Sequence, residues 1–122
     1  MSHIIAIAED DDILRETYEA MLPRAVPDTK IETFPEGDSL VERVRKGGVS
    51  LVFTDHDMPP GSNGITAIRR IREYDAKLPV YLMSANKDAL DMAIKVGATG
   101  IIDKRDDNAP KLMKGIAIQY CK

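Results

Sequence analysis

Acidic, hydroxyl and amino groups follow short apolar runs at several points of this sequence. One run is followed by Glu9 and Asp10, a second by Asp55, and two others by Ser84 and Lys104. Carboxylates that crowd together stay ionised only with a cation among them, and hard oxygen ligands with room for water suit Mg²⁺. A carboxylate beside such a metal can also act as a nucleophile toward phosphorus, and a nearby ammonium group offsets the charge of the transferred group.

These groups can meet only if the apolar runs are strands of one sheet. The runs predict buried strands at 4–8, 30–34, 50–54, 79–83 and 100–103. Amphipathic stretches between and after them predict helices at about 13–22, 38–46, 64–74, 87–96 and 110–120. Strands that alternate with helices form a parallel α/β sheet covered on both faces, and its ligands bind at the carboxyl ends of the strands.

Local signals indicate where the helices begin and end and which faces they bury. Asp11 or Asp12 is expected to cap the first helix, and Pro23 to end it. A cap at Asp38-Ser39 is expected to open the second helix. The spacing of apolar residues places Ile94 and Leu112 on inward faces of the last two helices.

Length and charge restrict the class of protein. The chain has 122 residues, which is enough for a single domain at 1–122. Its net charge of −3 makes a nucleic acid an unexpected direct partner. No apolar stretch approaches a membrane span, and the first residues lack the features of a signal peptide. With a lone cysteine at position 121, these features predict a cytoplasmic protein.

Taken in order, these residues resemble a receiver domain of a two-component response regulator, including the single-domain chemotaxis-regulator type. The resemblance covers the whole chain and rests on Glu9-Asp10, Asp55 with Met58-Pro59, Gly64, Ser84-Ala85 and Lys104. It implies a flavodoxin-like domain of five strand-helix units, with a parallel sheet in the order 2-1-3-4-5. It also implies a phosphoprotein of a phosphorelay and not an enzyme, beyond its own phosphorylation and slow self-dephosphorylation.

The resemblance assigns a role to each residue at the edge of the sheet. It implies that Asp55 accepts phosphate from a phosphohistidine of a sensor histidine kinase or phosphotransfer protein. Ser84 would bond the new phosphoryl oxygen, and Lys104 would pair with it. The added charge would change the surface formed by the fourth helix, the fifth strand and the fifth helix. That surface would meet a downstream protein of unknown identity, with the chain as a monomer or a phosphorylation-dependent dimer.

The same resemblance implies a set of metal ligands. Asp10, Asp55 and the backbone carbonyl of Asp57 would hold Mg²⁺, for which Mn²⁺ could substitute. Glu9 would act on the metal indirectly, through water. Asp57 also adds a carboxylate near the phosphoryl site, and we expect it to alter the lifetime of the phosphorylated form.

Several features depart from the usual pattern of the family. Arg105 replaces the usual proline after Lys104, and this predicts a trans peptide bond there. Ile101 occupies the position of the usual switch aromatic. The loop between Asp55 and Gly64 is one residue longer than usual, and we expect residues 60–62 to bulge beside the site.

Three other functions fit parts of the pattern. Asp55-His56-Asp57 is also an Asp-x-Asp motif, similar to the nucleophile motif of haloacid-dehalogenase-type phosphatases, although 122 residues are few for that class. A metal-dependent nucleic-acid enzyme similar to the topoisomerase-primase module fits less well, given the negative charge. Arg105 and Ile101 favour a third possibility, a receiver-like domain that signals without phosphate. His56 is expected to be a solvent-facing loop residue in the preferred interpretation.

Overall fold

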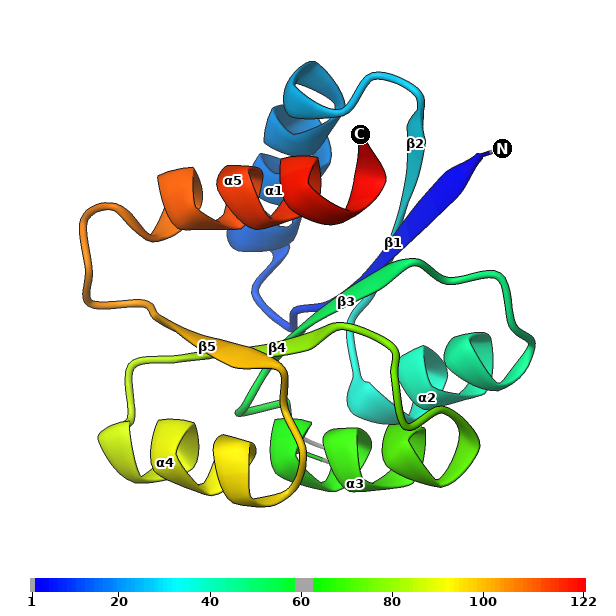
Figure 1. The fold of residues 1–122 in the computed structure, drawn as a ribbon. Helices are drawn as coiled ribbons and strands as arrows, with labels where there is room; N and C mark the ends of the chain where they lie inside the picture. The colour runs from blue at the N-terminus through cyan, green and yellow to red at the C-terminus, as the bar shows by residue number, and fades with distance from the viewer. Residues whose placement is uncertain (1, 59–62) are drawn as a thin grey trace.

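In a computed structural model that describes residues 2–58 and 63–122, parallel strands alternate with helices from one end to the other (Figure 1). The strands are β1 (His3–Ala8), β2 (Thr29–Phe34), β3 (Leu51–Asp55), β4 (Val80–Ser84) and β5 (Gly100–Asp103). The helices are α1 (Asp12–Ala25), α2 (Gly37–Arg45), α3 (Gly64–Tyr74), α4 (Lys87–Lys95) and α5 (Ala109–Cys121). The strand order is β2-β1-β3-β4-β5, so the expected flavodoxin-like topology is confirmed.

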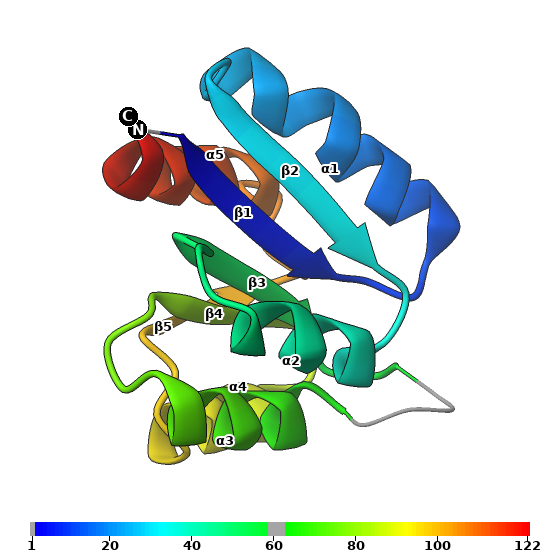
Figure 2. The same ribbon diagram turned by 90° about the vertical axis from the view of Figure 1, so that its right-hand side faces the viewer.

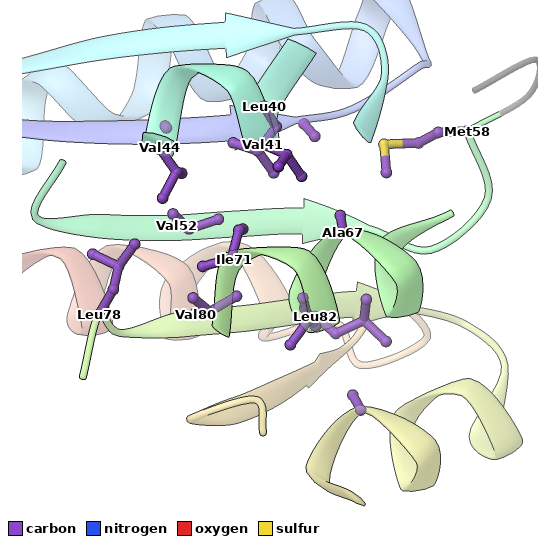
Figure 3. Packing of buried hydrophobic residues seen from close by; sticks show 14 of the residues in the cluster. Leu40, Val41, Val44, Val52, Met58, Ala67, Ile71, Leu78, Val80 and Leu82 are labelled. Carbon is purple, nitrogen blue, oxygen red and sulfur yellow. The ribbon is translucent and has the colours of Figure 1, made fainter. Parts of the chain in front are cut away.

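The sheet lies between two layers of helices, as Figures 1 and 2 show, with α1 and α5 on one face and α2, α3 and α4 on the other. Alternate residues of a strand point to opposite faces, so each central strand supplies both layers. In β3, Val52 packs toward α2 and α3, whereas Phe53 packs toward α1 and α5. Figure 3 shows the cluster of buried side chains between the sheet and helices α2, α3 and α4, which includes Leu40 and Met58. Burial on both faces explains why these strands read as unbroken apolar runs.

Helix bounds differ from the sequence prediction at two places. Asp11 caps α1 as expected, because its Oδ1 accepts hydrogen bonds from the backbone at 2.9 and 3.1 Å. The helix then continues through Pro23 to Ala25, so the prediction that Pro23 ends it was wrong. A proline in the last turn removes a single intrahelical hydrogen bond, which the turn tolerates. Helix α2 begins at Gly37, one residue before the predicted cap, with Glu36 as its N-cap residue.

Two apolar side chains predicted to point inward lie at the surface. Ile94 is 52% exposed and Leu112 is 47% exposed. Helix α4 instead packs through Ala89, Leu90 and Ala93, which form a narrow apolar stripe along one side of the helix. Because the stripe is narrow, one step of 100° around the helix is enough to carry the next side chain into solvent.

The guanidinium group of Arg72 ties α3 to the C-terminal end of α4. Its Nε donates to the carbonyl of Gly97 at 2.8 Å, and one terminal nitrogen donates to the carbonyls of Asp75 and Leu78 at 3.0 and 2.7 Å. Gly97 has a φ of +104°, a left-handed conformation that glycine adopts without strain at the end of a helix. This end of α4 is therefore fixed by side-chain hydrogen bonds as well as by packing.

Within the described parts of the chain, every helix is too short or too polar to cross a lipid bilayer.

Candidate functional site

The carboxyl ends of β1, β3, β4 and β5 bring the predicted site residues to one edge of the sheet. The register pairs Ala8 with Thr54 and Ser84 with Asp103, so the residues that follow each strand lie side by side. Glu9, Asp10 and Asp55 each offer a carboxylate oxygen, and these three oxygens lie within 4.8 Å of one another. Oxygen ligands grouped in this way suit a hard divalent cation such as Mg²⁺.

The ammonium group of Lys104 bridges two of these carboxylates. Its Nζ lies 2.9 Å from Oε1 of Glu9 and 2.9 Å from Oδ1 of Asp55. Burial alone would lower the pKa of Lys104, but hydrogen bonds to the two carboxylates outweigh it and raise the pKa above its ordinary value. Lys104 therefore carries a stable positive charge at the centre of the cluster.

Glu9 is the most buried of the three acids. Its residue is 0% exposed, and its Oε2 accepts a second hydrogen bond from the backbone of Asp11 at 3.3 Å. Burial raises the pKa of Glu9 to about 7, while the hydrogen bond from Lys104 lowers it and the charge of Asp55 raises it further. With both oxygens already engaged, Glu9 is less free than Asp10 to bind a metal directly. Asp10 is exposed at the mouth of the cluster.

Asp55 is held at the end of β3 with its residue 8% exposed. Besides Lys104, the backbone of His56 donates to its Oδ1 at 2.9 Å. The start of α3 lies against this strand end, because a Cβ atom on Gly64 would lie 2.3 Å from the carbonyl oxygen of Asp55. A glycine is therefore required at position 64 for this close approach.

Ser84 connects the site to helix α4. It is 3% exposed, and its Oγ accepts a hydrogen bond from the backbone of Asn86 at 3.0 Å. The side chain of Asn86 in turn caps α4 by accepting hydrogen bonds from Asp88 and Ala89. The carbonyl of Ser84 also accepts a bond from the backbone of Lys104 at 3.0 Å. A change at the Ser84 side chain can thus reach the first turn of α4.

The residues after Asp55 do not join the cluster through their side chains. The Asp57 side chain is 83% exposed and lies 3.8 Å from the His56 ring. His56 was expected to face solvent, yet its side chain is 19% exposed and its Nδ1 is buried without a partner among the described residues. Pro59 and the predicted bulge at 60–62 lie outside the described residues.

One pair that sequence reasoning missed lies directly beside Lys104. The Arg105 guanidinium binds both oxygens of Asp103, at 3.0 and 2.7 Å, and the Arg105 backbone donates to Oδ1 at 2.9 Å. These hydrogen bonds lower the pKa of Asp103 to about 2. An aspartate two residues before a backbone donor is a known turn signal, so the sequence Asp-Lys-Arg-Asp could have indicated it.

Comparisons with known proteins agree with this geometry. Residues 5–116 match the family model described as the response regulator receiver domain. The transcriptional regulatory protein AfsQ1 of Streptomyces coelicolor is 30% identical over 111 residues, which cover 91% of this chain and 45% of that protein. The oxygen regulatory protein NreC of Staphylococcus epidermidis is 28% identical, over 82% of this chain and 47% of its own. The chain thus spans less than half the length of these relatives.

Solved structures show the same fold. The receiver domain of the sensor histidine kinase PA1611 from Pseudomonas aeruginosa, with magnesium coordinated in its active site cleft, matches with a TM-score of 0.83 at 18% identity, covering 98% of both chains. The chemotaxis response regulator CheY4 of Vibrio cholerae matches with a TM-score of 0.80 at 17% identity, covering 97% of this chain and 99% of that one. Because the family model covers most of the chain, the protein belongs to the response regulator receiver domain family.

Proposed function

We propose that Asp55 accepts a phosphoryl group from a phosphohistidine of a sensor histidine kinase or phosphotransfer protein, in a step that requires Mg²⁺ or Mn²⁺. The observation that carries this proposal is the position of the Lys104 ammonium group, which lies 2.9 Å from Asp55 inside a cluster of three carboxylates. We further propose that residues 1–122 form one receiver module, whose surface at α4, β5 and α5 binds a downstream protein in a phosphorylation-dependent manner.

The hydrogen bonds of Asp55 suggest which oxygen reacts. Lys104 and the backbone of His56 both donate to Oδ1, so Oδ2 is the oxygen left for phosphorus. An Oδ2 electron pair forms the bond to phosphorus as the bond from phosphorus to the donor imidazole nitrogen breaks. The electron pair of that bond returns to the imidazole. The product is an acyl phosphate on Asp55 and a free histidine on the donor.

The surrounding residues hold the reacting groups and offset charge. Asp10 and Asp55 would hold the metal directly, with the carbonyl of Asp57 as a third ligand and Glu9 acting indirectly. The bound cation would neutralise charge on the phosphoryl oxygens. Lys104 can pair with the phosphoryl group without leaving the cluster.

Ser84 offers a route from the phosphoryl group to the surface. Its hydroxyl can donate to a phosphoryl oxygen while its oxygen already accepts from Asn86, the cap of α4. Ile101, at 40% exposure, lies on β5 beside α4. An added charge of roughly −1.5 to −2 at Asp55 would therefore act on α4 through Ser84, with no aromatic side chain at position 101.

The experiment is a labelling reaction followed by intact mass. The protein is incubated with Mg²⁺ and a small acyl-phosphate donor, and one acid-labile phosphate is expected, absent without the metal and absent in Asp55→Asn. The control is Asp28→Asn, because Asp28 lies in the turn before β2, far from this edge of the sheet. This variant should be labelled like the wild type. Labelling that persists in Asp55→Asn would refute the assignment of the acceptor.

The same assay separates the alternative functions. Sustained turnover of a generic phosphate ester would favour a phosphatase, whereas labelling that saturates at one phosphate favours the switch. The Asp57 side chain argues against the phosphatase, because it is 83% exposed and is not one of the three clustered carboxylates. Failure to label with every donor, a cognate kinase included, would favour signalling without phosphate.

A further inference from the structure

The Lys104 side chain is held at its ammonium end and borders a cavity. Its ammonium group must bridge Glu9 and Asp55 at one end of a flexible stem. That stem borders a cavity of about 180 Å³, whose other walls include Tyr18 and Met83. A lysine stem with open space on one side retains several rotamers, and ordering it costs side-chain entropy. Polar contacts of the neighbouring backbone therefore add to the two ion pairs in orienting the side chain.

Those contacts come from a turn at residues 103–106. The backbone of Asp106 donates to the carbonyl of Asp103 at 3.1 Å, which places Lys104 at the second position of the turn. The Asp103 carboxylate accepts from the backbone of Arg105 at 2.9 Å and binds the Arg105 guanidinium with both oxygens. On the other side, the carbonyl of Ser84 accepts from the backbone of Lys104. Both peptide groups that flank Lys104 are thus held by hydrogen bonds.

We propose that Asp103 is a positioning residue for Lys104. Its carboxylate, held by Arg105, fixes the peptide after Lys104 so that the stem points toward Asp55 and not into the cavity. Asp103 itself lies outside the carboxylate cluster. Among the described residues, its carboxylate forms hydrogen bonds with Arg105 and none with Glu9 or Asp55. The role of this turn rests on the proposed function of Asp55, whereas its effect on the geometry of Lys104 can be measured without phosphate.

The first experiment measures that geometry in the resting protein. Limited acylation with acetic anhydride, followed by peptide mass spectrometry, gives the rate at which Lys104 reacts relative to Lys30. Lys104 has a 22% exposed side chain and two carboxylate partners, whereas the Lys30 side chain is 70% exposed and serves as the internal standard. In Asp103→Ala we expect the relative rate of Lys104 to rise about three-fold or more, because the ammonium group leaves its partners.

Two variants make this result specific. Asp103→Asn keeps an oxygen that can accept from the Arg105 backbone, so it should retain a rate close to that of the wild type. Asp75→Ala removes an equivalent carboxylate, which accepts from the backbone of Lys77 and Leu78 in a turn at the opposite edge of the sheet, and should leave Lys104 unchanged. An unchanged Lys104 rate in Asp103→Ala, with the fold intact by thermal unfolding, would overturn the proposal.

The second experiment measures the consequence for Asp55. With a small acyl-phosphate donor and Mg²⁺, Asp103→Ala should label about five-fold more slowly than the wild type, and Asp103→Asn should recover most of the rate. In a Lys104→Ala background, Asp103→Ala should have no further effect, because the side chain that it positions is gone. A general structural role would instead slow labelling in both backgrounds, and that result would overturn the proposal.

The two experiments fail in different ways. If the wild type is not labelled at all, the proposed function fails, and the acylation rates still decide whether Asp103 positions Lys104. If the wild type is labelled and Asp103→Ala labels as fast as Asp75→Ala, the positioning role fails and the proposed function stands.

Discussion

Substituting Gly64 by alanine should disrupt the junction between strand β3 and helix α3. A Cβ atom at this position would lie 2.3 Å from the carbonyl oxygen of Asp55 and 2.6 Å from Cδ1 of Leu82. Both distances are below 3.0 Å, a limit that Cβ atoms essentially never cross. The oxygen belongs to the backbone and Leu82 is 0% exposed, so neither can move freely. The first turn of α3 must therefore move away from the strand.

The size of the effect follows from these contacts. Inserting a methyl group into a packed interior costs about 1 to 3 kcal/mol, and a clash with backbone lies at the upper end of that range. Gly115 provides a matched control in α5, because nothing lies within 4 Å of a Cβ atom there. Alanine is favoured over glycine inside a helix by about 1 kcal/mol, so Gly115→Ala should stabilise the protein. The two variants should differ by about 4 kcal/mol.

Equilibrium urea unfolding at pH 7 measures both free energies of unfolding, and the slopes check that each transition stays two-state. Gly64→Ala should also slow labelling of Asp55, the proposed acceptor, since α3 would no longer pack against the backbone of this residue. One result would refute the requirement for glycine at the close approach of Gly64 to the Asp55 carbonyl. That result is a free energy of unfolding for Gly64→Ala within about 1 kcal/mol of the wild type, with Gly115→Ala stabilising as expected.

Three further predictions concern charge, capping and phosphate lifetime. The pKa of Glu9 is raised from 4.5 to about 7, so the folded state binds its proton more tightly than the unfolded state. The stability that protonated Glu9 contributes is full below pH 4.5 and is lost as the pH rises to 7. The free energy of unfolding of the wild type, relative to that of Glu9→Gln, should therefore fall by about 3 kcal/mol between those pH values; parallel pH profiles would contradict this. Asn86→Ala removes the α4 cap and should lower the free energy of unfolding by about 1 kcal/mol, measured in urea, unlike a substitution at the exposed Lys87. Asp57→Asn should slow hydrolysis of the phosphorylated form, followed by intact mass, because its exposed carboxylate can accept a hydrogen bond from the attacking water; an unchanged decay rate would refute that role.

The strands and the site could be predicted from the sequence because both follow from simple periodic and topological rules. A strand buried on both faces is an apolar run, and parallel strands place Asp55 and Lys104 at the same edge of the sheet. The rotation of α4 could not be predicted, because its narrow contact stripe decides that Ile94 is exposed. The continuation of α1 beyond Pro23 could not be predicted either, because it depends on the helix tolerating the loss of one hydrogen bond in its last turn.

The turn around Lys104 escaped prediction for a different reason. Arg105 donates one backbone and two guanidinium hydrogen bonds to the Asp103 carboxylate, and such local bonds leave no periodic signal in a sequence. The partly buried position of His56 was missed because a histidine in a loop is more often exposed to solvent.

The Arg72 contacts affect how helix α4 can move. Arg72 holds the C-terminal end of this helix through the Gly97 carbonyl, whereas the N-terminal end depends on Asn86 and the hydroxyl of Ser84. In the proposed switch, a displacement that starts at Ser84 would therefore be largest at the first turn of α4 and smallest near Gly97. The displacement of each exposed side chain of α4 would then increase with its distance from the Arg72 contact, so Met92 and Ile94 would move less than Lys87.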